Sequence, residues 1–182
     1  NRCAIISDNI KGMKDLVHYV YSMGHRKIAY IHGADSAVTQ SRLSSFYLTC
    51  EELGIDIPIQ YVSEAPYRDT RGTYEETEKL LDLKNPPTCI LYPDDFACLG
   101  GINAISARGM RIPEDISVAG YDGARIARHF EPQLTTLKQD TRQIGKLAAQ
   151  KLIDLIERPK TTLIEQIVVK GEVFAGTSVK KI

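Results

Sequence analysis

The sequence lacks the features that would place this chain in a membrane or on nucleic acid. Its 182 residues contain no run of about 18 apolar residues, so no membrane-spanning helix is expected. Lys and Arg together number 23, as do Asp and Glu, and this neutral balance gives the chain no electrostatic reason to hold DNA by itself. No secretory signal opens the chain. It begins at Asn1 with a predicted strand at once, which suggests a chain cut inside a domain.

Motifs of common catalytic and metal sites are also missing. The four cysteines are widely spaced and form no C-x-x-C pair, so we expect buried, reduced thiols in a cytoplasmic protein. The four histidines show no H-x-x-x-H spacing, and no G-x-G-x-x-G, phosphate-binding loop or G-x-S-x-G occurs. Asp94 and Asp95 could suggest a magnesium site, but no lysine-bearing strand end or nucleophile completes one. We therefore expect no enzyme, no cofactor and no metal ion.

Apolar strands and amphipathic helices alternate along the chain, which indicates an α/β fold with a parallel sheet flanked by helices. The predicted strands and extended segments cover residues 3–7, 27–32, 59–62, 88–92, 116–120, 134–140 and 163–169. The first predicted helix can be capped by Asp8 or Asn9 and ends before Gly24. The other helices cover residues 39–53, 70–83, 96–108, 124–130 and 140–157. Residues 171–182 are expected to trail off.

Two acidic turns fall at the carboxyl ends of neighbouring predicted strands. Asp94 and Asp95 follow the strand over 88–92, and Asp122 follows the strand over 116–120. Ligands of open parallel sheets bind at that edge. Because no catalytic partner is in view, these carboxylates indicate binding rather than chemistry.

Residues 89–123, CILYPDDFACLGGINAISARGMRIPEDISVAGYDG, resemble the effector-binding domain of LacI/GalR-type bacterial transcription regulators. Four further segments agree in the same order: SDNIKGM at 7–13, GHRKIAYIHG at 24–33, RLSSF at 42–46 and PQLTTLKQD at 132–140. Each motif is weak alone, but all of them occur in register. The resemblance covers nearly the whole chain.

This resemblance implies a periplasmic-binding-protein-like type I fold, in which two α/β lobes joined by three crossovers hold a ligand between them. Residues 1–7 would be the last strand of the N-terminal lobe, and residues 8–136 the C-terminal lobe. Residues 137–165 would return to the N-terminal lobe, and residues 166–182 would supply the final C-terminal-lobe strand and tail. Most of the N-terminal lobe and the DNA-binding headpiece would then be absent, which would leave the helix over 140–157 without its packing partner.

The resemblance assigns two charged residues to the ligand. Arg42 matches the arginine of an R-x-x-G-F motif that reaches into the cleft, where its planar fork suits adjacent hydroxyls; Ser45 stands here in place of the glycine. Asp122 matches a cleft aspartate that accepts hydrogen bonds from ligand hydroxyls. From the pattern alone, Arg42 would be a surface arginine of an amphipathic helix, and Asp122 a residue that stabilises a turn.

Six further residues are candidate ligand contacts. Asp94 stands where the family commonly has Asn, and its charge would favour a polyhydroxyl or cationic ligand, whereas Asp95 would cap the following helix. Tyr67 matches an aromatic residue that stacks on the ligand ring, with a half-exposed loop tyrosine as the alternative. Ser36 and Val38 would lie in a cleft loop, and Asp8 and Thr141 at crossovers, where they could contact the ligand or form part of the hinge.

The helix predicted over 96–108 is apolar nearly all round, which is typical of a helix buried on two sides. In the resembling family this helix contributes to dimer contacts. Leu99, Ile102 and Asn103 are therefore candidate residues of a homodimer interface.

Together these features predict the effector-binding and dimerisation domain of a LacI-type regulator. A small molecule, expected to be a sugar or sugar derivative, would bind between the lobes and change the affinity of an absent helix-turn-helix headpiece for operator DNA. The alternative is a periplasmic sugar-binding protein of a transport system, which shares the fold. The family strings, the apolar helix and the unpaired cysteines favour the regulator. A small α/β enzyme is a third class, disfavoured because no nucleophile and base occur in a recognisable arrangement.

Overall fold

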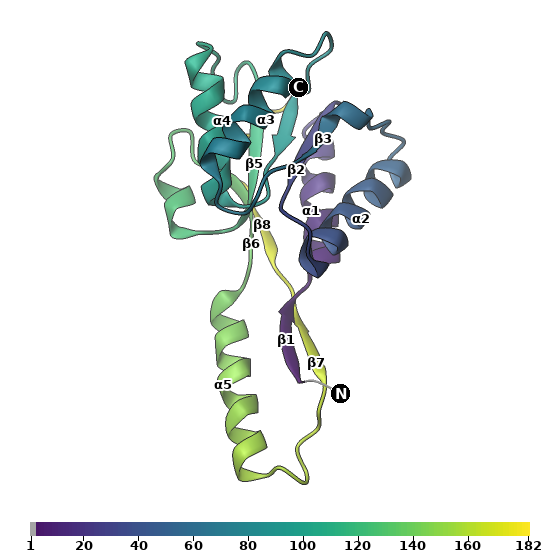
Figure 1. The fold of residues 1–182 in the computed structure, drawn as a ribbon, viewed down its shortest axis with the longest axis vertical. Coiled ribbons are helices and arrows are strands. Elements are labelled where there is room, and N and C mark those ends of the chain that lie inside the picture. Colours follow the sequence, from purple (N-terminus) through teal and green to yellow (C-terminus); the bar gives the residue numbers. More distant parts are fainter. Residues whose placement is uncertain (1–2) are drawn as a thin grey trace.

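Six strands form the sheet on which the larger part of the molecule is built. In this computed structural model, which describes residues 3–182, their order is β3-β2-β4-β5-β6-β8 (Figure 1). The strands are β2 (Ile28–His32), β3 (Val62–Glu64), β4 (Cys89–Leu91), β5 (Ser117–Asp122), β6 (Thr135–Lys138) and β8 (Glu172–Phe174). All pairs are parallel except β6 with β8. The predicted α/β fold with a mainly parallel sheet is confirmed.

Helices cover both faces of this sheet. α1 (Asn9–Ser22) and α2 (Ala37–Glu52) pack on one face, and α3 (Thr70–Leu81) and α4 (Asp95–Ala107) on the other (Figure 1). Successive residues of β2 serve the two cores in turn, since Tyr30 joins the α1–α2 core and Ile31 the α3–α4 core. Burial on both faces explains why these strands are continuous apolar runs rather than alternating ones.

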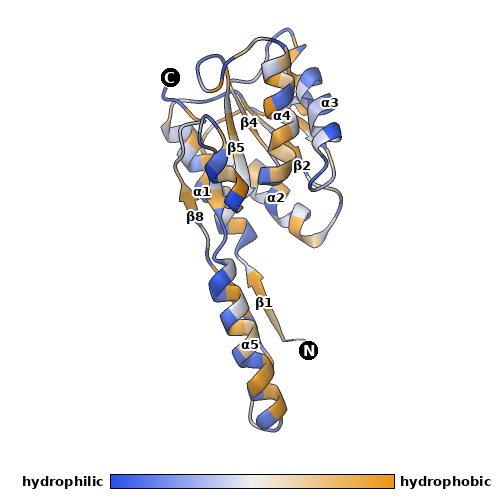
Figure 2. Ribbon diagram, turned by 90° about the vertical axis from the view of Figure 1, so that its left-hand side faces the viewer, coloured by the Kyte–Doolittle hydropathy of each residue, from blue (hydrophilic) through white to orange (hydrophobic). Residues whose placement is uncertain are grey.

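A smaller unit projects from the carboxyl edge of the large sheet. It consists of β1 (Ala4–Ser7), α5 (Thr141–Glu157) and β7 (Gln166–Val169), with β1 and β7 paired in parallel (Figure 1). α5 has no buried residue, and its far end is apolar (Figure 2). Leu152 and Ile156 are 60% and 72% exposed. Exposed apolar surface of this kind is typical of an interaction site.

The chain after residue 165 differs from the sequence prediction. The strand over 166–169 was expected in the C-terminal lobe, but it pairs with β1 in the small sheet. Residues 171–182 do not trail off: β8 adds an antiparallel edge to the large sheet, and the buried Ser178 hydroxyl donates to the carbonyl of Val118. The sequence predicted a strand that contains β7 but not its partner, and β8 is too short to show a clear period.

Short 3-10 turns replace two predicted elements. Residues 59–61 form the turn η1 (Ile59–Tyr61), and the predicted strand begins after it, as β3. The short helix predicted over 124–130 is the 3-10 turn η2 (Arg125–His129). Neither difference moves the carboxyl edge of the sheet, where the candidate site lies.

Close packing of α3 against α4 gives a first prediction. A Cβ on Gly100 would collide with the backbone carbonyl of Thr70 and the hydroxyl of Thr73. Gly100→Ala is therefore expected to lower the free energy of unfolding by about 1–3 kcal/mol, because α3 must move away. Ser106→Ala, on an exposed position of the same helix, is the control and should change it by less than about 0.5 kcal/mol. Chemical denaturation of the intact protein measures both, and equal effects would contradict the prediction.

Candidate functional site

Arg42 is the buried centre of the carboxyl edge. It lies on α2, yet only 4% of its surface is exposed. Its Nε donates to Oδ1 of Asn9 at 2.9 Å, and Nη1 donates to the carbonyl of Pro93 at 3.1 Å. The guanidinium also stacks on the ring of Tyr121, with Cζ 3.6 Å from the ring centroid. The surface-arginine alternative is excluded, because α2 aims this side chain across the ends of β4 and β5.

Asp122 ends β5 and meets Arg42. Its Oδ1 lies 3.7 Å from Nη2 of Arg42 and accepts a hydrogen bond from Nε2 of Gln139 at 2.5 Å. The side chain remains 42% exposed, so it can still accept from a ligand. Burial raises the pKa of this carboxyl, and the charge of Arg42 opposes that rise. Asp122 also has a φ of 106°, a strained conformation that non-glycine residues adopt mainly where surrounding structure imposes it, often at functional sites.

Asp95 supplies the bonds that hold this turn. Its Oδ2 accepts from the amide of Ala124, and its Oδ1 from the hydroxyl of Thr136, both at 2.6 Å. The side chain is fully buried, and burial raises its pKa to about 7 despite these two bonds. Gly120 allows the carboxylate in, because a Cβ there would collide with Oδ1.

The cap predicted at Asp95 is wrong, because Asp94 fills that role. Asp94 has extended backbone angles, and its Oδ1 accepts from the amide of Ala97 at 2.8 Å. Its Oδ2 accepts from the amide of Arg68 at 2.8 Å, and the residue is 2% exposed. Two adjacent aspartates can each start a helix, so the sequence alone does not decide between them. Direct ligand contact by Asp94 remains an untested prediction.

Val38 and Tyr67 lie near Arg42, and Ser36 caps the helix that carries it. A cavity of about 440 Å³ is lined by Val38 and Arg42 together with Ile6, Ser7, Asn9, Ala37, Ser41, Gln139 and Ile144. Ser36 caps α2 through the amide of Thr39 at 3.1 Å. The Tyr67 hydroxyl lies 2.9 Å from the hydroxyl of Thr39, and its ring centroid is 5.9 Å from Cζ of Arg42.

Asp8 and Thr141 lie where the chain passes between the two units. Asp8 caps α1 through the amide of Lys11 at 3.0 Å, as predicted, and its own amide donates to the carbonyl of Val169. Thr141 begins α5 and is exposed; it lines a second cavity, of about 390 Å³, between β6–α5 and β7–β8. These two residues therefore lie near the crossovers, and Asp8 directly precedes Asn9, the partner of Arg42.

The apolar character of α4 has an explanation within the chain. The sheet covers one side of the helix, and α3 covers another, with the hydroxyl of Thr73 donating to the carbonyl of Ala97 at 2.6 Å. Leu99 and Ile102 are half-buried, and Asn103 is exposed. A second subunit is thus not needed to account for burial of α4 on two sides.

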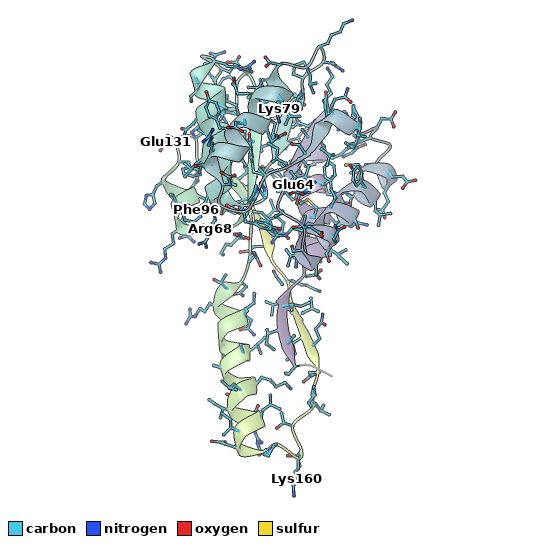
Figure 3. All side chains as sticks on the ribbon, viewed as in Figure 1. Glu64, Arg68, Lys79, Phe96, Glu131 and Lys160 are labelled. Atoms are coloured by element: carbon cyan, nitrogen blue, oxygen red, sulfur yellow. The ribbon has the colours of Figure 1, made fainter. Side chains whose placement is uncertain are left out.

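Four residues of the site were not anticipated from the sequence. Asn9 and Gln139 hold Arg42 and Asp122 from the two crossovers. Arg68 and Phe96 lie together at the end of the larger unit that faces α5 (Figure 3). A positive φ of 60° at Arg68 has no sequence signal, because glycine is the residue that marks such positions.

Within residues 3–182, no group of three or more His, Cys, Asp and Glu side chains is placed to hold a metal ion. In the same part of the chain, no helix combines the length and the apolar content needed to cross a bilayer. Cys50, Cys89 and Cys98 are buried, Cys3 is half-buried, and all four thiols are free. Burial raises the pKa of Cys50 to about 12, so this thiol stays protonated and unreactive. The charged groups of Arg42 and Asp122 are suited to binding a polar molecule.

Comparison with known proteins gives the family. The sequence profile of the periplasmic binding protein-like domain matches residues 17–179. The probable HTH-type transcriptional repressor ExuR of Bacillus subtilis (strain 168) is 34% identical over 179 residues, which are 98% of this chain and 53% of that protein. The HTH-type transcriptional repressor CytR of Escherichia coli (strain K12) is 30% identical over 151 residues, 82% of this chain and 44% of that protein. This chain therefore spans about half the length of the curated relatives it matches.

Solved structures agree. A putative transcriptional regulator LacI from Bacillus cereus subsp. cytotoxis NVH 391-98 superposes with a TM-score of 0.91 at 26% identity, over 99% of this chain and 64% of that chain. The transcriptional regulator CelR in complex with cellobiose superposes with a TM-score of 0.88 at 26% identity, over 97% of this chain and 54% of that chain. The chain belongs to the periplasmic binding protein-like domain family, and it corresponds to the C-terminal part of the effector domain of LacI-type transcriptional regulators.

Proposed function

We propose that this chain binds a small-molecule effector, a sugar or sugar derivative, between its larger unit and the β1–β7–α5 unit of a LacI-type repressor. The observation that carries the proposal is the Arg42–Asp122 pair at the carboxyl edge. Arg42 lines the cavity of about 440 Å³ between the two units, and Asp122 beside it is half-exposed. A guanidinium and a carboxylate side by side can bind the donors and acceptors of adjacent hydroxyls.

The nature of the effector is supported by what surrounds this pair. Tyr67 and Phe96 offer aromatic faces at the same edge, and such faces suit the C–H faces of a sugar. The structure of the similar regulator CelR is that of a complex with cellobiose. Asp94 is only 2% exposed and both of its oxygens accept backbone amides, so it offers a ligand no free acceptor. A direct ion pair between Asp94 and a cationic ligand, considered from the sequence, is therefore disfavoured.

Effector binding would change the arrangement of the two units through the crossovers. Asp122 is bonded to Gln139, and the next residue, Asp140, caps α5 through the amide of Gln143 at 2.9 Å. A ligand that hydrogen-bonds to Asp122 would thus disturb Gln139, which directly precedes the cap of α5 at Asp140. Its effect on DNA affinity is set by the difference between its affinities for the two arrangements.

The rest of the protein would supply what this chain does not contain. The remainder of the N-terminal lobe would cover the apolar residues of α5, and a helix-turn-helix domain would bind operator DNA in the cytoplasm. Leu99, Ile102 and Asn103 remain candidates for a homodimer interface. The curated relatives carry the names of repressors, which favours a regulator over a transport protein or an enzyme.

The proposal is tested with the intact protein. A panel of sugars is screened for those that raise the melting temperature of the protein. Each sugar found is then added to assays of the protein's binding to DNA from the promoter of the gene that encodes it. An effector at one hundred times its Kd is expected to stabilise the protein by about 2.7 kcal/mol, and the same sugar should change DNA affinity. Asp122→Ala should abolish both responses, whereas Glu131→Ala, on an exposed position in the loop before β6 (Figure 3), should keep them. A sugar that binds with no effect on DNA affinity would point to a transport protein.

A further inference from the structure

Arg68 is a cation at the cleft edge that has no part in the Arg42–Asp122 pair. It lies in the loop between β3 and α3, and its amide is fixed by Oδ2 of Asp94 at 2.8 Å. Its side chain is exposed at the end of the larger unit that faces α5 (Figure 3). The guanidinium lies over the ring of Phe96, with Cζ 5.4 Å from the centroid, and Phe96 is itself 38% exposed.

The neighbouring carboxylates do not neutralise this cation. Within residues 3–182, the Arg68 guanidinium makes no ion pair and no hydrogen bond to a side chain. Asp94 accepts the amides of Arg68 and Ala97 with its two oxygens. Asp122 faces Arg42 and Gln139 instead. The charge of Arg68 is nevertheless felt at Asp122, where it lowers the pKa of the carboxyl. Arg68 therefore has donors to spare beside the Arg42–Asp122 pair.

The backbone keeps Arg68 at this place. Its φ of 60° is unusual for a residue with a side chain, and the bond from its amide to Asp94 helps to hold that conformation. Tyr67, the preceding residue, packs its ring against Gly33, where a Cβ would collide with it. Asp94 and Tyr67 thus fix the backbone of Arg68, whereas its side chain is exposed.

On this basis we infer that Arg68 binds an anionic group of the effector, so that the ligand is an acidic sugar rather than a neutral one. This inference rests on the proposed function: Arg42 and Asp122 would hold the hydroxyls, and Arg68 would bind a carboxylate or a phosphate. The planar fork of arginine suits both groups bidentately. The ring of Phe96 beneath the guanidinium provides an apolar surface on which the C–H face of the same ligand can rest.

The test compares matched pairs of ligands on the intact protein by calorimetry. The probes are glucose and galactose, the uronic acid of each sugar, and the 6-phosphate of each sugar. At least one acid is expected to bind about tenfold or more tightly than the neutral sugar of the same stereochemistry. Arg68→Gln should reduce the ratio of the two affinities to about one, whereas Arg68→Lys should retain part of the preference for the acid. Arg71→Gln is the control, since Arg71 is 89% exposed and pairs with Glu75.

The outcomes separate this inference from the proposed function. A preference for uronic acids identifies a carboxylate as the group at Arg68, and a preference for the phosphates identifies a phosphate. Neutral sugars that bind as tightly as every acid, or a preference that survives Arg68→Gln, would overturn the inference. Binding of a neutral sugar that is lost in Asp122→Ala would leave the proposed function standing in that case. The absence of binding by every acid of the panel also counts against Arg68 as an anion site.

Discussion

Arg42→Ala is expected to destabilise the protein by about 3 kcal/mol and to abolish the stabilisation that an effector provides. The guanidinium satisfies Asn9 and the carbonyl of Pro93, stacks on Tyr121 and faces Asp122. Its removal leaves buried acceptors unpaired and a carboxylate without its cation, and losses of this kind are costly. Thermal melting of the intact protein, with and without a bound sugar, measures both effects.

Two further variants separate the role of this arginine in binding from its role in folding. Arg42→Lys keeps the charge but loses the planar fork, so stability should recover in part while ligand affinity remains low. Arg26→Ala is the matched control, because Arg26 also stacks on a tyrosine, with Cζ 3.5 Å from the Tyr21 ring, but lies in an exposed position. An Arg42→Lys protein with unchanged affinity for the sugar would exclude a bidentate contact.

The sequence predicted the edge of the sheet better than the contacts along it. Because β4 and β5 are parallel neighbours, the acidic turns that follow them had to meet at one edge. The family resemblance assigned Arg42 and Asp122 separately to the ligand cleft, but their contact was not predicted, since no local pattern directs a helix residue across two strand ends. The cap predicted at Asp95 is formed by Asp94, and Asp95 joins a buried network instead, because the helix starts one residue earlier than predicted.

Features that depend on distant pairing could not be read from the sequence. β7 and β8 are four and three residues long, and their partners, β1 and β6, lie far away in the chain. Arg68 lies in a predicted loop, and the sequence shows neither its positive φ nor that the nearby carboxylates bond to other groups. Gln139 reaches Asp122 because β6 pairs with β5, a neighbour relation that the sequence does not show.

Asp95 is expected to make the protein less stable as the pH rises from about 4 to 7. Its ordinary pKa is 3.8, and burial raises it to about 7 in the folded protein. Between these values the folded state keeps a proton that the unfolded state has released, so each pH unit costs about 1.4 kcal/mol of stability. The contribution of the neutral carboxyl is complete below pH 4 and is lost once the pH passes 7. Asp122 and Asp94 add to the effect, because their charges also raise the pKa of Asp95.

Asp95→Asn isolates this contribution, because the amide has the same shape and cannot ionise. Its carbonyl oxygen can still accept from the amide of Ala124 and so support the turn that carries Asp122. The difference in unfolding free energy between wild type and Asp95→Asn, from denaturation of the intact protein at pH 5 and pH 8, should shift by roughly 3 kcal/mol in favour of the variant at the higher pH. Glu131→Gln, which removes an exposed carboxylate, should show no such shift. A constant difference would mean that the bonds from Thr136 and Ala124 keep Asp95 ionised at both pH values, and that its charge, rather than its proton, holds the turn at Asp122.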